Sequence, residues 1–554
     1  MTSRRDFLRT STAAAAVLAG APGLLLRSHA GADIVVRNGT VFDGLGGPGR
    51  ELDVVISGGR IARLARRTSE RGAVEIDARG LAVAPGFIDI HSHGDGTLWE
   101  DPRAESLVRQ GITTIVVGQD GSSRAPRGGD GADDESRNQF ARFSDLWTAI
   151  DRLQPSVNVA SMIGLGTIRG VVIGGKDRPA TSDELARMVE MVRQAIADGA
   201  CGASSGLEYT PGAFAPLDEL IALCKPLAAR RLAYATHMRN EDDRLIEAID
   251  ESIAVARGAG CPLQISHLKT QGPRNWAKLD VAFARIAAAR KAGCDAAFDR
   301  YPYTAYQTGL SNLFPVWSRD NSTAAFLARL TDASTADRIK QETLAKVELI
   351  GGWNNVMVSN VSSAGDKQAE GARLGDYAAR QHADPYATAI GLLQRNRGNV
   401  GMVGFAMSED NIDRILSHPQ GMVCSDGGAY ATDGPSHRGH PHPRGLGTFP
   451  RVLARYVRER KALTLEQAIH KMSAFPASRI HLADRGRIAP KMAADVVVFD
   501  PAKVQDTATY DNPFQYPVGI DTVIVNGSIA LRDGQRSNQK SGRAVEAGRG
   551  MREG

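Results

Sequence analysis

The sequence is poor in cysteine: its 554 residues include five, and no two of them form a CxxC pair. An odd, scattered set of this kind does not suit a disulfide framework. We therefore expect free and mostly buried thiols at Cys201, Cys224, Cys261, Cys294 and Cys424.

The sequence also lacks a block of like charge beyond its first 30 residues. The formal net charge is +5, and residues 1–30 contribute +3 of it. No basic patch remains that would indicate a nucleic-acid partner. A membrane-spanning run is absent as well, because the apolar segment at 11–26 is short and is interrupted by Gly20, Pro22 and Gly23. We therefore expect neither nucleic-acid binding nor a stable membrane span.

Residues 1–30 resemble a twin-arginine export signal. Arg4 and Arg5 precede the apolar run, and Ser28-His29-Ala30 places small residues at the usual cleavage positions. The sequence thus predicts that the twin-arginine export machinery carries the folded protein to the periplasm or the outside of the cell.

The length and composition indicate a large globular α/β protein, neither disordered nor fibrous. Short Val/Ile-rich runs separated by NG and GG turns predict β-hairpins in residues 31–80. Similar runs return in residues 483–534, and we expect the two parts to form one small, discontinuous β-sandwich domain. The polar segment 535–554 is expected to be a loosely attached C-terminal tail.

Between these parts, residues 81–482 alternate buried-strand patterns with helical ones, such as 182–199 and 278–293. The alternation predicts a (β/α)8 TIM barrel with inserted loops, whose chemistry lies at the C-terminal strand ends. The candidate strands are 82–91, 112–118, 157–164, 202–206, 232–237, 263–269, 294–303, 355–359, 403–407 and 421–426.

Histidines stand at several of these strand ends. His91 and His93 follow GFID one residue apart, so in an extended strand their side chains face the same side. His237 and His267 each follow a run of apolar or small residues and precede a polar loop. Neutral imidazole is a good ligand for zinc and its neighbours, and four such positions together favour a metal site over separate structural histidines.

Asp426 in GMVCSDGG adds a carboxylate at a late strand end. A carboxylate there can bind a metal or take a proton from water, and the alternative is an Asx-turn residue before glycines. Ser204 and Ser205 do not predict a serine nucleophile, because no GxSxG elbow surrounds them.

With these residues in place, the chain resembles the amidohydrolase superfamily, and within it the D-aminoacylase or N-acyl-D-amino-acid deacylase family. The resemblance covers nearly all of the chain after the signal. It rests on APGFIDIHSHGD, SSGLEYTPG, THMRNE, SHLK, DRYPYTA, SDG, HPHPRGLGTFPRVL, NPFQYPVGI and VNG.

The resemblance implies a zinc-dependent amidohydrolase that acts on the linear amide of N-acyl-D-amino acids. His237 and His267 would hold the tight zinc ion, His91 and His93 a second, weaker metal position, and Asp426 would be the catalytic acid/base. The family's bridging cysteine lies in a VGNCG-like segment, where this chain reads VVGQDG. Asp120 therefore takes its place, and a carboxylate tolerates a wider range of metals than a thiolate.

The resemblance also implies that Lys269, Tyr301 and Arg444 hold the α-carboxylate of the substrate. A second departure is Leu165, which stands where relatives commonly carry the histidine of GHG. The two departures leave open a D-residue dipeptidase, a lactonase or a cyclic-amide hydrolase with the same metal chemistry. A non-catalytic metal-binding relative is the remaining alternative, and the sequence assigns no oligomeric state.

Overall fold

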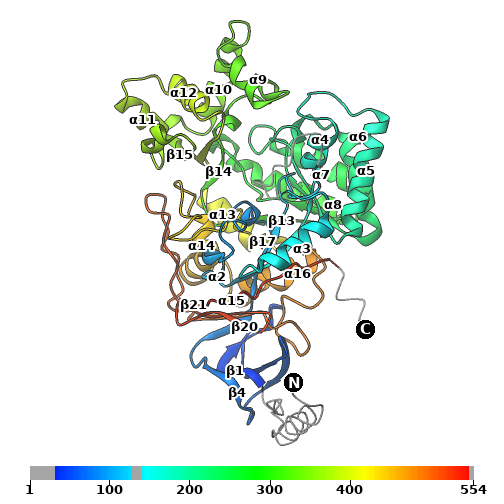
Figure 1. Cartoon of the computed structure of the whole chain (residues 1–554), viewed down its shortest axis with the longest axis vertical. Helices are drawn as coiled ribbons and strands as arrows, with labels where there is room; N and C mark the ends of the chain where they lie inside the picture. Colours follow the sequence, from blue (N-terminus) through cyan, green and yellow to red (C-terminus); the bar gives the residue numbers. More distant parts are fainter. Residues whose placement is uncertain (1–31, 128–138, 548–554) are drawn as a thin grey trace, which may run out of the picture.

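The computed structural model describes residues 32–127 and 139–547 (Figure 1). The predicted export signal, residues 1–30, lies outside the described residues. The chain is α/β, as predicted. In the described residues no helix is both long and apolar enough to cross a membrane. All five cysteines are free and buried, which confirms the prediction made from their spacing.

Strands from both ends of the chain pair in one nine-stranded sheet, which lies at the bottom of Figure 1. The two groups meet where β5 and β18 pair antiparallel, with Ala84 opposite Val497. Alternating Val and Ile side chains, such as Val36 and Val54, fill the core on one face. The strands are β1 (Ala32–Val41), β2 (Arg50–Ser57), β3 (Arg60–Ala65), β4 (Gly72–Asp77), β5 (Ala82–Pro85), β18 (Val496–Phe499), β19 (Ile520–Val525), β20 (Ser528–Arg532) and β21 (Gln535–Arg536).

The predicted strand 82–91 is divided at Gly86. Pro85 ends β5, and β6 (Phe87–Asp89) pairs instead with a parallel strand of the central region. The Gly86 N–H donates to the Asp495 carbonyl at 2.8 Å, and a Cβ here would lie 2.3 Å from the Thr113 side chain. Only glycine fits so close a passage, so the nine-stranded sheet extends to Pro85 rather than ending at residue 80.

The central region consists of parallel strands that occupy two hydrogen-bonded sheets. The Cys201 N–H donates to the Ser161 carbonyl at 3.0 Å and links the two sheets at one side. At the other side the Asp426 N–H donates to the His91 carbonyl at 2.8 Å. The strands are β6, β7 (Ile112–Val117), β8 (Asn158–Ser161), β9 (Ile163–Gly164), β10 (Gly202–Gly206), β11 (Ala233–His237), β12 (Leu263–Ile265), β13 (Ala296–Arg300) and β17 (Gly421–Val423).

Helices follow most of the parallel strands and pack apolar faces against them. The predicted helix at 182–199 is α5 (Ser182–Ala197), and Thr181 begins it with a capping box to Glu184. The predicted helix at 278–293 is α8 (Leu279–Lys291). The others are α2 (Glu105–Val108), α3 (Phe143–Leu153), α4 (Leu165–Val172), α6 (Leu217–Cys224), α7 (Leu245–Ala259), α13 (Glu409–Ser417), α14 (Arg444–Arg451), α15 (Leu465–Met472) and α16 (Ala474–Arg479).

Two of the ten predicted barrel strands are wrong. Residues 355–359 and 403–407 belong to β15 (Val356–Val361) and β16 (Val400–Phe405), which pair antiparallel with each other. With β14 (Ala305–Gly309) they form a separate three-stranded sheet. Together with α9 (Thr323–Arg329), α10 (Ala336–Leu349), α11 (Leu374–Arg380) and α12 (Pro385–Arg395) it makes an inserted segment, residues 305–405, at the top of Figure 1.

The prediction of a loosely attached tail is wrong for residues 535–547. The Val159 N–H of β8 donates to the Arg543 carbonyl, and the Val545 N–H donates to the Val159 carbonyl, both at 2.9 Å. The Gly542 N–H donates to the Pro155 carbonyl at 2.8 Å. The segment is therefore attached through its backbone along a parallel strand, while most of its polar side chains stay half-buried or exposed.

We expect Gly542→Ala to lower the thermal stability of the protein, because the added Cβ would lie 2.1 Å from the Val157 carbonyl oxygen. Loss of two or three backbone hydrogen bonds corresponds to about 2 kcal/mol. Thermal unfolding followed by circular dichroism measures the effect. Gly47→Ala is the control, since a Cβ there meets nothing within 4 Å. Equal melting temperatures for both variants would show that the C-terminal segment contributes nothing.

Candidate metal centre

The predicted ligands come together at the C-terminal ends of the parallel strands. His237 is the last residue of β11, and the other side chains lie two to four residues beyond their strands. They are His91 and His93 after β6, Asp120 after β7, His267 after β12 and Asp426 after β17. Residues far apart in the sequence therefore meet because parallel strands end at one edge.

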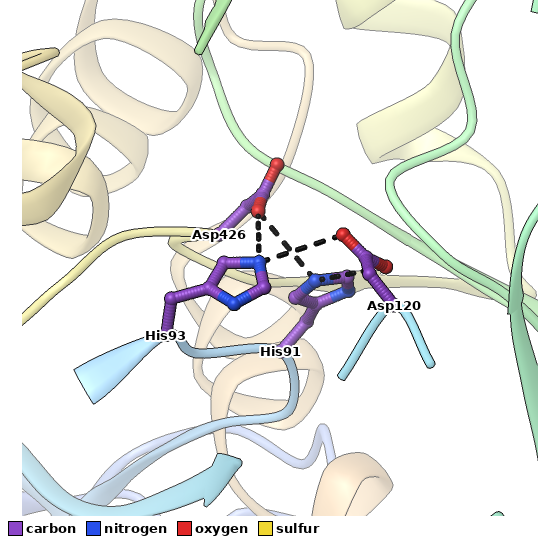
Figure 2. A group of neighbouring side chains, drawn as sticks. All are labelled: His91, His93, Asp120 and Asp426. Atoms are coloured by element: carbon purple, nitrogen blue, oxygen red, sulfur yellow. Dashed lines mark ion pairs between the residues drawn. The ribbon is translucent and has the colours of Figure 1, made fainter. Parts of the chain in front are cut away.

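One half of the site contains His91, His93, Asp120 and Asp426, whose side chains point toward one another (Figure 2). The His93 Nε2 atom lies 3.1 Å from Asp426 Oδ1 and 3.5 Å from Asp120 Oδ2. The His91 Nε2 atom lies 3.5 Å from Asp120 Oδ1 and 3.5 Å from Asp426 Oδ1. Two nitrogens and two carboxylates thus face one common point.

The other half contains His237 and His267, and it shares Asp120 with the first. The His237 Nδ1 and His267 Nε2 atoms are 3.0 Å apart, and they lie 3.7 and 3.4 Å from Asp120 Oδ2. Asp120 therefore lies between the two histidine pairs, at the position that the resemblance assigned to a bridging ligand.

The backbone of three site residues is held in the left-handed region. The φ angles are 52° for Asp120, 36° for His267 and 49° for Asp426. Such angles cost a non-glycine residue free energy and are concentrated at functional sites. The Asp120 backbone packs closely against Gly206, where a Cβ would lie 2.1 Å from the Asp120 carbonyl oxygen, so only glycine fits beside this turn.

Ser204 secures the same turn. Its hydroxyl donates to the Gly118 carbonyl at 2.6 Å and accepts from the Gly121 N–H at 3.0 Å. It is buried and has a structural role, as the missing GxSxG elbow predicted.

Three carboxylates missed by the sequence analysis lie behind the histidines. His91 Nδ1 lies 3.6 Å from Asp299, and His267 Nδ1 lies 3.2 Å from Glu241. His237 Nε2 lies 3.4 Å from Glu208. A metal-binding histidine commonly directs its second nitrogen to a carboxylate, which fixes the ring. The signal was present, since Glu208, Glu241 and Asp299 all lie in the family motifs SSGLEYTPG, THMRNE and DRYPYTA.

The carboxylates set the protonation of the histidines. Burial lowers the pKa of His93, but Asp120 and Asp426 more than offset this and raise it to about 9. Glu241 and Asp120 likewise raise the pKa of His237 to about 10. Burial raises the pKa of Asp120, but His91 and His267 more than offset this and hold it well below its usual range. The ionised carboxylates of the pocket therefore need positive charge beside them, from protonated imidazoles or from a bound cation.

The donor set fits a divalent cation. Both ring nitrogens of His91 and Asp120 Oδ1 are buried without a hydrogen-bond partner. Such unsatisfied atoms are rare in proteins, and a bound ion is one of their standard explanations. Imidazole nitrogens and carboxylate oxygens are ligands for zinc and other divalent metals. His91, His93, Asp120, His237 and His267 would hold the metal.

The three predicted substrate-binding residues line the same cavity, which has a volume of about 300 Å³. Lys269 Nζ donates to Glu241 Oε1 at 2.6 Å and lies 2.7 Å from His267 Nδ1. Arg444 donates through one terminal nitrogen to Asp426 Oδ2 at 2.6 Å. The hydroxyl of Tyr301 is buried and has no hydrogen-bond partner, and the Arg444 guanidinium lies 4.8 Å from its ring centroid.

His442 positions Arg444. Its Nδ1 accepts from the Arg444 backbone N–H at 2.9 Å, and its Nε2 lies 3.0 Å from the Ala305 carbonyl oxygen. Leu165 is buried at the start of α4, so the second departure from the family pattern lies in an apolar environment.

Histidines and carboxylates at the C-terminal ends of parallel strands, beside a cavity with an arginine, are the arrangement of a metal-dependent hydrolase. The model of the amidohydrolase family matches residues 74–280 and 414–530. The chain belongs to this family.

Individual relatives match most of the chain. It is 38% identical over 501 residues to an N-acyl-D-glutamate deacylase of Alcaligenes xylosoxydans xylosoxydans, covering 89% of this chain and 93% of the relative. It is 34% identical over 520 residues to a D-aminoacylase of the same organism, covering 93% and 97%.

A solved relative shares the fold. It is N-acyl-D-glutamate deacylase from Bordetella bronchiseptica, complexed with zinc and a phosphonate inhibitor that mimics the tetrahedral intermediate. The TM-score is 0.81 at 34% identity, and the match covers 93% of this chain and all of the other.

We expect divalent metal to displace protons from the metal-free protein at pH 7.5. His93 and His237, with pKa values near 9 and 10, are protonated there, whereas metal binding requires neutral imidazole. Affinity should therefore fall as the pH falls, and proton release should decline as the pH rises through about 9 and 10, the pKa values of His93 and His237.

Zinc titration in weak buffer with a pH indicator measures this release. His237→Gln should reduce it, and His481→Gln, whose imidazole contacts the Arg231 carbonyl away from the cavity, should not. Zinc binding without proton release would contradict the charge balance described above.

Proposed function

We propose that the protein hydrolyses the amide bond of N-acyl-D-amino acids to a D-amino acid and a carboxylic acid, with zinc as the metal. One observation carries the proposal: a histidine–carboxylate cluster and an arginine with an open edge share one cavity. The deacylase relatives, which match about nine-tenths of the chain, support this chemistry.

Arg444 is suited to hold the α-carboxylate while it keeps Asp426. One terminal nitrogen donates to Asp426, but Nε has no partner and the other terminal nitrogen has only a 3.4 Å contact with the Gln307 carbonyl oxygen. A planar guanidinium can bind a second carboxylate along that edge. The free hydroxyl of Tyr301 supplies a further donor.

Lys269 is less available than Arg444, because Glu241 already neutralises it. The side chains of Lys269 and Glu241 are 2% and 1% exposed, so breaking this ion pair would leave a buried charge without a partner. We therefore propose that Arg444 makes the main ionic contact with the α-carboxylate of the substrate. Lys269 forms part of the cavity wall that faces this carboxylate.

Asp426 is placed to move the proton of the reaction. Its Oδ1 faces His93 and His91, and its pKa is lowered by Arg444 and His267 despite burial, so it is ionised at neutral pH. It accepts a proton from the attacking water and returns it to the leaving amine nitrogen as the C–N bond breaks. The metal, when bound, polarises the scissile carbonyl and acidifies water.

With the carboxylate of Asp120 in place of a bridging thiolate, the site favours harder metal ions. Its Oδ1 faces His91, and its Oδ2 faces His93, His237 and His267. Carboxylate oxygens suit manganese and related ions as well as zinc. We propose a tight ion at His237 and His267 and a weaker second position at His91 and His93.

We also infer that the two parallel sheets form one closed (β/α)8 barrel, and that the nine-stranded sheet forms a satellite domain beside it. The hydrogen bonds Cys201 to Ser161 and Asp426 to His91 support the closure. The arginine pair and cleavage-site residues of the first 30 residues support export to the periplasm or beyond.

An activity panel tests the function. Purified protein with measured metal content should hydrolyse N-acyl-D-amino acids in preference to their L-enantiomers, D-residue dipeptides, lactones and cyclic amides. Preferred turnover of another class would overturn the proposal. Bound metal with no turnover of any class would indicate a non-catalytic relative.

We expect Asp426→Asn to reduce kcat by about 10²–10⁴-fold, because the amide cannot accept the proton. Metal content and the circular dichroism spectrum should stay close to those of the wild type. Asp433→Asn is the matched control, since that carboxylate is exposed and pairs with Arg103. Wild-type kcat in Asp426→Asn would remove this residue from the mechanism.

We expect Arg444→Met to lower kcat/KM by about 10²-fold for substrates with a free α-carboxylate, since a charged hydrogen-bonded pair is lost. Substrates that carry an α-carboxamide should be affected less, because they lose only the support that Arg444 gives to the ionised Asp426. Arg438→Met, which removes an exposed arginine of the same loop paired with Glu100, should change neither. Equal losses for both substrate types would argue against carboxylate binding by Arg444.

A further inference from the structure

A second cavity, of about 360 Å³, lies next to the catalytic cavity. Tyr209 and Asn312 line both cavities and form their common wall. The lining of the second cavity is largely polar, and it includes one cationic side chain, Arg319, which follows β14 in the inserted segment.

Arg319 has neutral partners only. One terminal nitrogen donates to Asn312 Oδ1 at 2.6 Å and the other to the Glu208 backbone carbonyl at 3.0 Å. Its Nε is buried without a partner. Throughout residues 32–127 and 139–547, no carboxylate forms an ion pair with this guanidinium, although the Glu208 carboxylate attracts it from beyond that distance. Burial lowers the pKa of Arg319, and the attraction of the Glu208 carboxylate offsets this only in part.

The other Lys and Arg side chains that line the two cavities differ in this respect. Lys269 pairs with Glu241 at 2.6 Å, and Arg444 pairs with Asp426 at 2.6 Å. Lys346 pairs with Asp242 at 2.5 Å. Arg319 is thus the lining cation that has no ion pair of its own among the described residues, so an anionic ligand could become its first.

The arrangement of the catalytic cavity indicates which part of a substrate would reach this wall. Arg444 and Asp426 lie at the half of the metal centre that contains His91 and His93. Tyr209 packs on His237, in the other half, with ring centroids 4.6 Å apart. A substrate whose α-carboxylate binds Arg444 and whose carbonyl lies at the metal centre therefore extends its acyl group toward Tyr209 and Asn312.

The wall itself is built from exchangeable polar contacts. Asn312 Nδ2 donates to Thr308 Oγ1 at 2.8 Å, and Thr308 Oγ1 lies 3.4 Å from the Tyr209 hydroxyl. One terminal nitrogen of Arg319 donates to Asn312 Oδ1, which is an uncharged acceptor. A carboxylate is a stronger acceptor for the same donor.

We propose that Tyr209, Asn312 and Arg319 form an acyl-group subsite that favours acyl groups ending in a carboxylate, so that monoamides of dicarboxylic acids are preferred substrates. This proposal rests on the proposed function and adds the chemical class of the acyl group. The reaction itself is unchanged: water cleaves the amide, and the second product is a dicarboxylate.

The test compares matched acyl groups on one D-amino acid. N-succinyl and N-glutaryl substrates are measured against the corresponding terminal carboxamides, with the N-acetyl substrate as reference. We expect the wild-type kcat/KM to favour the terminal carboxylate by about tenfold or more for at least one chain length. Arg319→Met should abolish that ratio, and Arg319→Lys should keep part of it.

Arg338→Met is the control, because Arg338 is an exposed arginine of α10 in the same inserted segment and pairs with Glu342. It should leave the ratio unchanged. Should Arg319→Met fail to fold, the wild type alone decides: free succinate or glutarate should inhibit hydrolysis of the N-acetyl substrate more strongly than the matching monoamide.

Hydrolysis of N-acetyl substrates with no preference for a terminal carboxylate would overturn the subsite and leave the proposed function intact. A preference that persists in Arg319→Met would also overturn it. Failure to hydrolyse any N-acyl-D-amino acid would instead overturn the proposed function, so the two failures are distinguishable.

Discussion

The site depends on one buried carboxylate, Asp120, which faces imidazole nitrogens from three different strand ends at 3.4–3.7 Å. Removing a carboxylate from water costs several kcal/mol unless positive charge surrounds it. The four histidines supply that charge when protonated, and a divalent cation supplies it when bound. Asp120 also has a left-handed backbone, packed closely against Gly206, and this conformation costs a non-glycine residue free energy.

A second layer of charges keeps the histidines in place. Glu241 illustrates it, since this one carboxylate lies within ion-pair distance of His237, His267 and Lys269. It is 1% exposed, so its contacts are little screened by solvent. A change at Glu241 would therefore alter two metal-facing rings and one cavity cation together, which makes the cavity wall and the metal centre a single electrostatic unit.

The sequence predicted which residues gather in the candidate site better than it predicted the architecture around them. His91, His237, His267 and Asp426 were identifiable because a short apolar strand and a polar loop flank each one. Periodicity could not tell which sheet a short apolar run joins, so β15 and β16 were misassigned.

Two further errors have similar physical origins. The division at Gly86 depends on a close approach to Thr113 from another strand, which no local pattern reveals. The C-terminal segment looks like solvated chain because backbone pairing with Val159 needs no apolar side chains. Glu208 and Glu241 were missed because a carboxylate in a loop is ordinarily solvated, and only the assembled site shows that Glu241 is buried and Glu208 half-buried beside histidines.

The family model matches two segments of the chain, and the residues between them line a different part of the cavity from the candidate metal ligands. All the metal-facing residues, together with Asp426 and Arg444, fall within the matched segments 74–280 and 414–530. Tyr306, Asn312 and Lys346 line the same catalytic cavity but lie in the unmatched residues 281–413. The strands thus bring the candidate metal ligands, which lie in the matched segments, and the inserted segment brings further side chains that line the same cavity. Differences in acyl-group and side-chain preference between relatives are therefore expected to arise in the inserted segment, where substitutions leave the metal centre intact.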